Sequence, residues 1–247
     1  VGSEMCIRDR SDPDYGTPYF DRGDIDDWGD ELAVDFGASG LWGYDGGWTR
    51  LTTGNAQWMG SYSGKLAVDF GASGLYEYNG SSWTRLTSGN ADNSGNTMTA
   101  FGGALVVDFG TAGLWKYDGA WTKISSANVD WLTSYGGMLA ADFGAYGLWK
   151  YDGAWTKIST SNPDNGGNTM AAYVGGLAVD FGASGLYFYN GAGWTWLSTA
   201  NPQWLRAYGD KLAVDFGASG LWQYNGSSWT KITTGNADNS GNTMIDW

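Results

Sequence analysis

Leu32-Ala-Val-Asp-Phe-Gly-Ala-Ser-Gly-Leu-Trp-Gly-Tyr-Asp-Gly46 is the stretch that decides the fold, because close copies of it recur along the chain. Leu32, Val34 and Phe36 alternate with small or polar residues, which is the period-two pattern of a short β-strand. A Gly-Ala-Ser-Gly turn and a second strand follow, and the closing Asp-Gly predicts a tight hairpin into a third. The stretch therefore predicts a meander of short antiparallel strands.

The motif occurs six times, and its copies alternate in kind. Its aspartate lies at Asp35, Asp69, Asp108, Asp142, Asp180 and Asp215, and every second aspartate is separated by 73, 73, 72 and 73 residues. The connectors after the first, third and fifth copies are short and carry a tryptophan, whereas the others are longer and polar. The true unit is therefore a pair of motifs present three times, and such a period is typical of propellers and solenoids.

A fourth strand precedes each motif, as in Met98-Thr-Ala-Phe101, so each repeat of about 36 residues supplies four strands. Apolar residues occupy both faces of these strands, as expected for small sheets sandwiched between neighbours. We therefore predict an all-β fold, a β-propeller of six four-stranded blades; another blade count in a longer array, and a solenoid, remain open. In strand count and aromatic-glycine rhythm, the repeats resemble the short blades of WD-repeat and tachylectin-like propellers.

The two ends differ from the repeats. Residues 1–10 resemble a translated sequencing adapter, which indicates a metagenomic fragment, and residues 11–24 form an acidic leader or the tail of a preceding repeat. The propeller spans residues 25–247. It has one surplus strand, since Ile25–Trp28 and Met244–Trp247 both match the innermost strand of a blade. Truncation at both ends is the interpretation that we favour.

Composition excludes several functions. The chain of 247 residues has no histidine, one cysteine and a net charge of −13, so Cys/His zinc sites and His-dependent triads are impossible, and nucleic acid is an unsuitable partner. No apolar run is long enough to insert in a membrane. Because the motif aspartates recur in every blade, we assign them a structural role as acceptors for the amides of the adjoining turn. We therefore expect neither catalysis nor a cofactor.

Three tryptophans stand out because they occur only in alternate connectors. Trp58, Trp131 and Trp204 are each preceded by an asparagine, at Asn55, Asn128 and Asn201. Chain direction places these connectors on the same rim as the Gly-Ala-Ser-Gly turns. One interpretation is that the indoles fill alternate blade junctions. The other is that the six residues form three ligand sites, since an aromatic platform beside an amide suits a sugar. Lectin propellers also place sugars between blades, which the resemblance implies here.

Two further hypotheses concern ions and partners. The connectors Asp92–Asn96, Asp164–Asn168 and Asp238–Asn242 are rich in oxygen ligands, but each has one carboxylate, so calcium stays open and no metal site is assigned. The leading functional hypothesis is a non-catalytic, lectin-like propeller, bacterial and extracellular or on the cell surface, with glycans as partners. The alternative is a structural or protein-interaction propeller within an adhesive surface protein. The oligomeric state is not predictable from the sequence.

Overall fold

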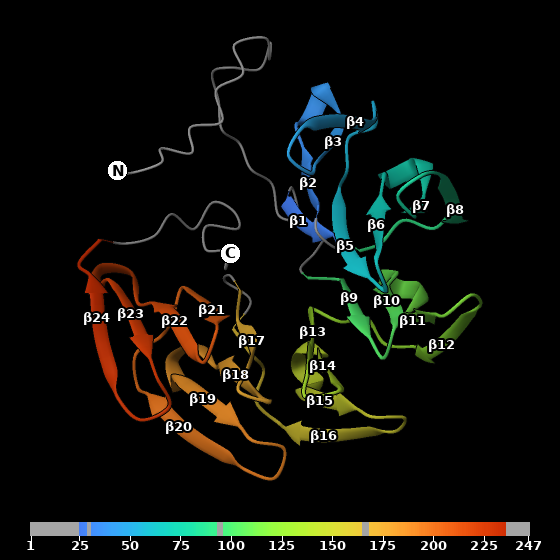
Figure 1. Ribbon diagram of the computed structural model, residues 1–247. Coiled ribbons are helices and arrows are strands. Elements are labelled where there is room, and N and C mark those ends of the chain that lie inside the picture. Colours follow the sequence, from blue (N-terminus) through green and yellow to red (C-terminus); the bar gives the residue numbers. More distant parts are fainter. Residues whose placement is uncertain (1–24, 29–30, 93–95, 165–167, 236–247) are drawn as a thin grey trace, which may run out of the picture.

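The chain forms six four-stranded antiparallel sheets, as Figure 1 shows for a computed structural model that describes residues 25–28, 31–92, 96–164 and 168–235. The first three blades consist of β1 (Ile25–Trp28), β2 (Glu31–Asp35), β3 (Leu41–Tyr44) and β4 (Trp48–Thr52); β5 (Trp58–Tyr62), β6 (Lys65–Asp69), β7 (Leu75–Tyr78) and β8 (Trp83–Thr87); and β9 (Met98–Phe101), β10 (Ala104–Asp108), β11 (Leu114–Tyr117) and β12 (Trp121–Ser125).

The last three blades repeat the same order. They consist of β13 (Trp131–Tyr135), β14 (Met138–Asp142), β15 (Leu148–Tyr151) and β16 (Trp155–Ser159); β17 (Met170–Tyr173), β18 (Gly176–Asp180), β19 (Leu186–Tyr189) and β20 (Trp194–Ser198); and β21 (Trp204–Tyr208), β22 (Lys211–Asp215), β23 (Leu221–Tyr224) and β24 (Trp229–Thr233). In each sheet the strands pair in sequence order. The predicted all-β fold with six four-stranded blades is confirmed.

The blades are arranged around a common centre with the first strand of each sheet innermost (Figure 1). Consecutive inner strands pack side by side from β1 through β5, β9, β13 and β17 to β21. The strand β1 takes the innermost position of the first sheet, where it pairs with β2. The competing stretch Met244–Trp247, the adapter-like residues 1–10 and the acidic residues 11–24 lie outside the described residues.

A single 3-10 turn joins the second and third strands of each blade, where the Gly-Ala-Ser-Gly turn was expected. These turns are η1 (Gly37–Ser39), η2 (Gly71–Ser73), η3 (Gly110–Ala112), η4 (Gly144–Tyr146), η5 (Gly182–Ser184) and η6 (Gly217–Ser219). Gly185, which closes η5, has φ of +92°, and a Cβ atom there would lie 2.1 Å from the carbonyl oxygen of Ser198. Only glycine fits, because both the backbone angle and the close approach exclude a side chain.

The core lies between blades rather than inside one sheet. Five apolar clusters, one at each junction of consecutive blades, unite residues from neighbouring sheets. The leucine that opens the third strand is fully buried in five blades, at Leu41, Leu75, Leu114, Leu148 and Leu186. This arrangement explains why apolar residues occupy both faces of the strands. The helices of the described residues are three-residue turns, and none has the length or apolar character to cross a membrane.

Candidate functional site

The motif aspartates organise the rim that carries the 3-10 turns. One carboxylate oxygen of Asp69 accepts a hydrogen bond of 2.9 Å from the amide of Gly71 in its own turn, and the other accepts one of 3.0 Å from Ala91. Ala91 belongs to the connector that enters the next blade. The predicted structural role is therefore confirmed, and it extends to the neighbouring blade. Equivalent bonds across the junction join Asp35 to Ala56 and Asp108 to Val129.

Two connectors depart from this scheme because they carry proline. The residues that correspond to Ala91 after Asp142 and Asp180 are Pro163 and Pro202, and proline has no amide hydrogen to donate. Both aspartates retain the bond of 2.9 Å from their own turn, donated by the first glycine of that turn. At these two positions the connector backbone therefore cannot donate the bond that Ala91 donates to Asp69.

Burial of the carboxylates raises their pKa, and the hydrogen-bond donors oppose the rise. The pKa of Asp69, which receives two amide bonds, is raised to about 6. The pKa values of Asp142 and Asp180 are raised to about 7. Burial is the largest cause, one amide opposes the rise in each, and the nearby charges of Asp130 and Asp164 add to it. The pKa of Asp108 is also raised to about 7, first by burial and further by the nearby charges of Asp92 and Asp130. The loss of a hydrogen-bond donor and the presence of a nearby negative charge thus both raise the carboxyl pKa.

A cleft of about 770 Å³ opens on this rim between the third and fourth blades. The connector after β12 contributes Asn128 and Asp130, and the turn η4 contributes Tyr146. Trp149 of β15 and Trp155 of β16 complete the aromatic lining. The cleft therefore combines aromatic rings with an amide and a carboxylate, which is the composition of a small-molecule site.

Tyr146 and Trp149 are coupled within this cleft. The indole nitrogen of Trp149 donates a hydrogen bond of 3.1 Å to the carbonyl oxygen of Tyr146, and the ammonium of Lys157 lies 5.2 Å from the centre of the indole ring. The side chain of Tyr146 is 73% exposed. Trp155 is fixed differently, because its indole nitrogen donates to Ile124 in the preceding blade, 2.7 Å away. Tyr146 is therefore the aromatic side chain with the most freedom to contact a ligand.

The three alternate tryptophans lie in strands rather than in connectors. Trp58, Trp131 and Trp204 are the first residues of β5, β13 and β21, and each pairs with the motif aspartate of its blade. Trp131 and Trp204 are only 5% and 4% exposed, and Trp58 is partly buried. This placement differs from the expected open platform, because the indoles of Trp58 and Trp131 pack against the following blade.

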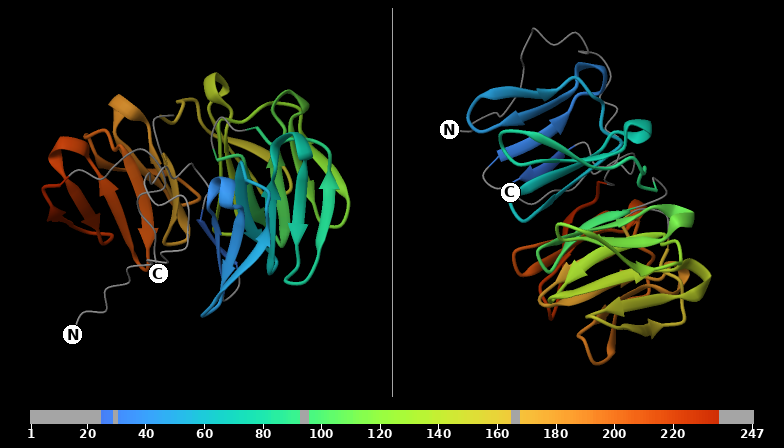
Figure 2. Two further views of the ribbon diagram at one scale, coloured as in Figure 1. Left: turned by 90° about the horizontal axis from the view of Figure 1, so that it is seen from above. Right: turned by 90° about the vertical axis from the view of Figure 1, so that its right-hand side faces the viewer.

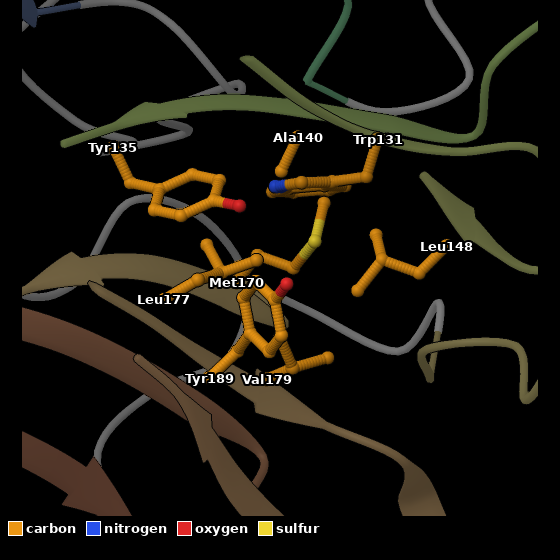
Figure 3. Close-up of a cluster of buried hydrophobic side chains, with 8 residues drawn as sticks. All are labelled: Trp131, Tyr135, Ala140, Leu148, Met170, Leu177, Val179 and Tyr189. Carbon is orange, nitrogen blue, oxygen red and sulfur yellow. The ribbon is translucent and has the colours of Figure 1, made fainter. Parts of the chain in front are cut away.

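Trp131 illustrates this packing. It lies in the cluster between the fourth and fifth blades, against Met170 and Leu177 (Figure 3). In the alternate blades the corresponding position is a buried threonine, Thr97 or Thr169, whose carbonyl oxygen accepts the amide of the motif aspartate. Tryptophan and threonine thus alternate at one position of the inner strand. The junction-filling interpretation accounts for the alternation that the sequence shows.

The three asparagines stay on the rim, as expected. Asn128 lines the cleft, whereas Trp131 does not contribute to its lining. Asn55 is exposed, and Asn201 is exposed and donates a hydrogen bond of 3.4 Å to the carboxylate of Asp164. The structure therefore keeps the rim asparagines together with the turns and separates them from the indoles.

Tyr146 is the residue that sequence reasoning missed. It replaces the serine or alanine found at the third position of the other five turns. Tyr146 does not stand out among the repeated residues, because what distinguishes it is that it differs from the repeat. The same signal marks Trp196, an exposed tryptophan on β20 at a position where every other blade has lysine or arginine.

The polar connectors have a structural role where they are described. The side-chain amides of Asn96 and Asn168 donate hydrogen bonds of 2.8 and 2.9 Å to Leu132 and Leu205 in the following blades. Within residues 25–28, 31–92, 96–164 and 168–235, no three aspartate, glutamate or cysteine side chains gather as a metal ion would require. The connector at Asp238–Asn242 lies outside these ranges.

Comparison with known proteins gives the fold. No family model and no curated protein matches the chain. Among solved structures, BBS1N in complex with ARL6DN is 12% identical over 90% of this chain and 84% of its own, with a TM-score of 0.59. The GH74 enzyme of Niastella koreensis is 14% identical over 90% of this chain and 38% of its own, with a TM-score of 0.58.

A third similar structure is the extracellular domain of the putative one component system BT4673 from B. thetaiotaomicron. It is 12% identical, covers 92% of this chain and 37% of its own, and has a TM-score of 0.62. The solved structures that resemble this chain are β-propeller proteins, and they include an enzyme, an extracellular domain and a propeller bound to a protein. Identities this low support the propeller architecture alone.

Proposed function

We propose that this chain is a non-catalytic, carbohydrate-binding propeller whose principal site is the rim cleft between the third and fourth blades. The observation that carries the proposal is the exposed ring of Tyr146, placed in a cleft of about 770 Å³ beside Asn128 and Asp130. Tyr146 departs from the serine or alanine of the other five turns, and it lines a cleft together with polar side chains, which is the combination expected of a binding site.

The chemistry of the cleft suits a sugar. A pyranose has an apolar face that stacks on an aromatic ring and an equatorial edge of hydroxyl groups that need fixed hydrogen-bonding partners. Tyr146 and Trp149 supply rings, Asn128 supplies an amide and Asp130 a carboxylate. Because the indole N–H of Trp149 is engaged by Tyr146, the indole offers its ring rather than its nitrogen.

The rim asparagines extend the proposal to weaker sites. Asn55 and Asn201 occupy the same connector position at the junctions that precede the second and sixth blades. Three sites on one rigid rim would increase avidity by about 10²–10⁴ where a ligand spans them. In this proposal Trp58, Trp131 and Trp204 shape the junctions below these asparagines. The buried indole nitrogens of Trp58 and Trp204 donate to no described residue, so a ligand or water oxygen that reached them would gain a bond.

A glycan array followed by fluorescence titration tests this function. We expect at least one sugar class to change tryptophan emission, and Tyr146→Ala to weaken its binding about tenfold or more, which corresponds to the loss of one stacking contact. Trp196→Ala is the matched control, since it removes an exposed aromatic from β20, away from the cleft. Absence of binding to every glycan, or unchanged affinity in Tyr146→Ala, contradicts the proposal.

The second candidate is a structural or protein-interaction propeller within a bacterial surface protein. The observation that favours it is that Tyr44 of the first blade and Ile232 of the sixth are 40% and 49% exposed, whereas their counterparts in the other blades are partly or fully buried. For either function we propose an extracellular or cell-surface location. The two candidates give different experimental results. A propeller that binds only protein shows no binding on the glycan array, and it forms a complex of higher mass with its protein partner.

A further inference from the structure

The outer half of each blade repeats one pairing between its third and fourth strands. An aromatic residue follows the leucine that opens the third strand, and in five blades the residue opposite it on the fourth strand is lysine or arginine. The cationic group lies 5.2 to 5.9 Å from the centre of the aromatic ring, which is the geometry of a cation–π interaction. The five pairs are Arg50 with Trp42, Arg85 with Tyr76, Lys123 with Trp115, Lys157 with Trp149 and Lys231 with Trp222.

The fifth blade departs from this pairing. Trp196 of β20 lies opposite Tyr187 of β19, at the position that lysine or arginine occupies in the other five blades. Residues directly opposite each other on antiparallel strands direct their side chains to the same face of the sheet. The fifth blade therefore presents two aromatic rings on this face, where each of the other blades presents a ring and a cation.

Tyr187 is held in place by neighbouring rings. Its ring centre lies 5.7 Å from that of Phe181 and 6.5 Å from that of Trp194, in both cases edge to face. Trp194 is fixed in turn, because its indole nitrogen donates a hydrogen bond of 2.9 Å to the carbonyl oxygen of Ile158 in the fourth blade. The ring of Tyr187 is therefore ordered before any ligand binds, which lowers the entropy cost of binding.

Trp196 is open to solvent. It is 53% exposed, and within the described part of the chain its indole makes no ring contact and donates no hydrogen bond. It lies in the outermost strand of its sheet, at the periphery of the molecule (Figure 1). Ser198 on the same strand closely approaches Gly185 at the end of η5, so the pair lies near the rim that carries the 3-10 turns, which the left view of Figure 2 shows along one side of the molecule. A second molecule therefore has access to the pair from outside the ring of blades.

The charge of the fifth blade favours a cationic ligand. Residues 170–198 contain no lysine or arginine, whereas the strands of each of the other five blades carry at least one. The one charged residue in this range is acidic, Asp180, and the whole chain has a net charge of −13. A positive ligand therefore meets no basic side chain of this blade, and the field of the whole protein attracts it.

We propose that Trp196 and Tyr187 form a second binding site, which accepts a lysine or arginine side chain of a partner protein. The cation takes the place over the Tyr187 ring that the chain's own lysine or arginine fills in the other blades, and Trp196 supplies a second ring beside it. The site does not depend on the carbohydrate function proposed above, because it lies on another blade than the rim cleft and takes a ligand of different chemistry.

Two capped tripeptides test the site, one with arginine and one with its neutral isostere citrulline between two glycines. Saturation-transfer NMR of the peptide measures binding, and the tryptophan indole N–H signals of the protein locate it. We expect the arginine peptide to shift the Trp196 signal in a saturable manner. The citrulline peptide should bind about two- to fivefold more weakly, which is the effect of one exposed cation–π contact. Added salt should weaken the binding of the arginine peptide.

Three variants place the binding at this pair. Trp196→Lys restores the pairing of the other five blades, so it should fold as the wild type does, by circular dichroism, and lose the arginine peptide. Arg85→Trp recreates a tryptophan opposite Tyr76 in the second blade and should add one further indole signal that shifts with the arginine peptide. Tyr146→Ala is the matched control, since it removes an exposed aromatic side chain of the rim cleft, and it should bind the peptide unchanged.

Four results would overturn the proposal. A Trp196 signal that the arginine peptide leaves in place would show that the pair takes no cation. Equal binding of the citrulline peptide would show that charge is not recognised, and unchanged binding in Trp196→Lys would assign the peptide to another surface. A glycan that shifts the Trp196 signal where the peptide does not would make the pair a sugar platform.

Discussion

The carboxylate of Asp69 bonds at once to Gly71 in its own blade and to Ala91 in the connector of the next, at 2.9 and 3.0 Å. A single buried side chain thus fixes both the turn and the junction between two sheets. The sequence positions of the motif aspartates predict the first of these bonds. The second depends on which residue of the connector reaches the carboxylate, and that is a property of how neighbouring blades pack.

Asp69→Ala is expected to lower the free energy of unfolding by about 2–3 kcal/mol, because two amides lose an acceptor at about 1–1.5 kcal/mol each. Asp142→Ala should cost less, since Pro163 offers no amide across that junction. Chemical denaturation of both variants measures the difference. Equal losses would mean that the bond between blades contributes nothing.

Stability should fall as the pH rises from 5 to 8. The pKa values of Asp142 and Asp180 are about 7 in the folded chain and near 3.8 when unfolded, so the folded state holds protons that the unfolded state has released. Stability from the neutral carboxyls is therefore complete below about pH 4 and is lost as the pH passes 7. Melting temperatures at several pH values test the slope.

Asp142→Asn provides the control for this pH dependence. Its amide cannot ionise, while its side-chain oxygen can still accept the bond from Gly144. The variant should show a smaller fall in melting temperature between pH 5 and pH 8. A melting temperature that increases with pH in the wild type would contradict the assignment.

Pro163→Ala should lower the pKa of Asp142 toward that of Asp69. The substitution restores an amide hydrogen at the position where Ala91 donates to Asp69, and a donor to the ionised form lowers a carboxyl pKa. Carboxyl titration by NMR measures the shift. An unchanged pKa for Asp142 would mean that this connector does not bring its amide within reach.

Gly185→Ala should destabilise the fold by about 2–4 kcal/mol. The new Cβ combines a left-handed backbone with an overlap at 2.1 Å on the Ser198 carbonyl oxygen. Gly191→Ala is the control, because Gly191 has φ of +94° with nothing within 4 Å of a Cβ atom. It should cost about 1 kcal/mol. Similar losses in both variants would assign the whole effect to the backbone angle.

Trp131→Ala and Asn128→Ala should separate packing from binding. Removal of the buried indole leaves a cavity beside Met170 and should cost about 3–5 kcal/mol in unfolding free energy. Asn128 is exposed on the cleft, so its replacement should leave stability within about 0.5 kcal/mol and weaken ligand binding. Thermal melts and glycan titrations of the two variants provide the comparison. A destabilised Asn128→Ala variant would give the asparagine a structural role instead.

The fold could be predicted from the sequence because each repeat carries its own strand and turn signals. The period of Leu32, Val34 and Phe36 and the glycine turn both match the observed strands and 3-10 turn. The orientation of Trp131 could not be predicted this way. Whether a residue at a strand end faces the rim or the next blade depends on its pairing with Asp142, which only the assembled sheet defines.

The cleft was harder still to predict. Its lining comes from two blades, with Asn128 after β12 and Tyr146 in η4, so no continuous motif describes it. The repeated asparagine marks the rim on which the cleft opens, since Asn128 is part of its lining. Tyr146 is a single departure from the consensus, and the sequence contains no sign that it faces a space rather than a neighbouring side chain.

The alternation of tryptophan and threonine at the start of the inner strand gives the propeller two kinds of seam. Trp58 packs toward Met98, and Trp131 toward Met170, whereas the seam after the Thr97 blade pairs Val106 and Leu114 with Leu132. Losing or gaining one blade would bring two unlike seam surfaces together. Losing or gaining two would leave every seam matched, so an array of this kind can change length without repacking only in steps of two blades.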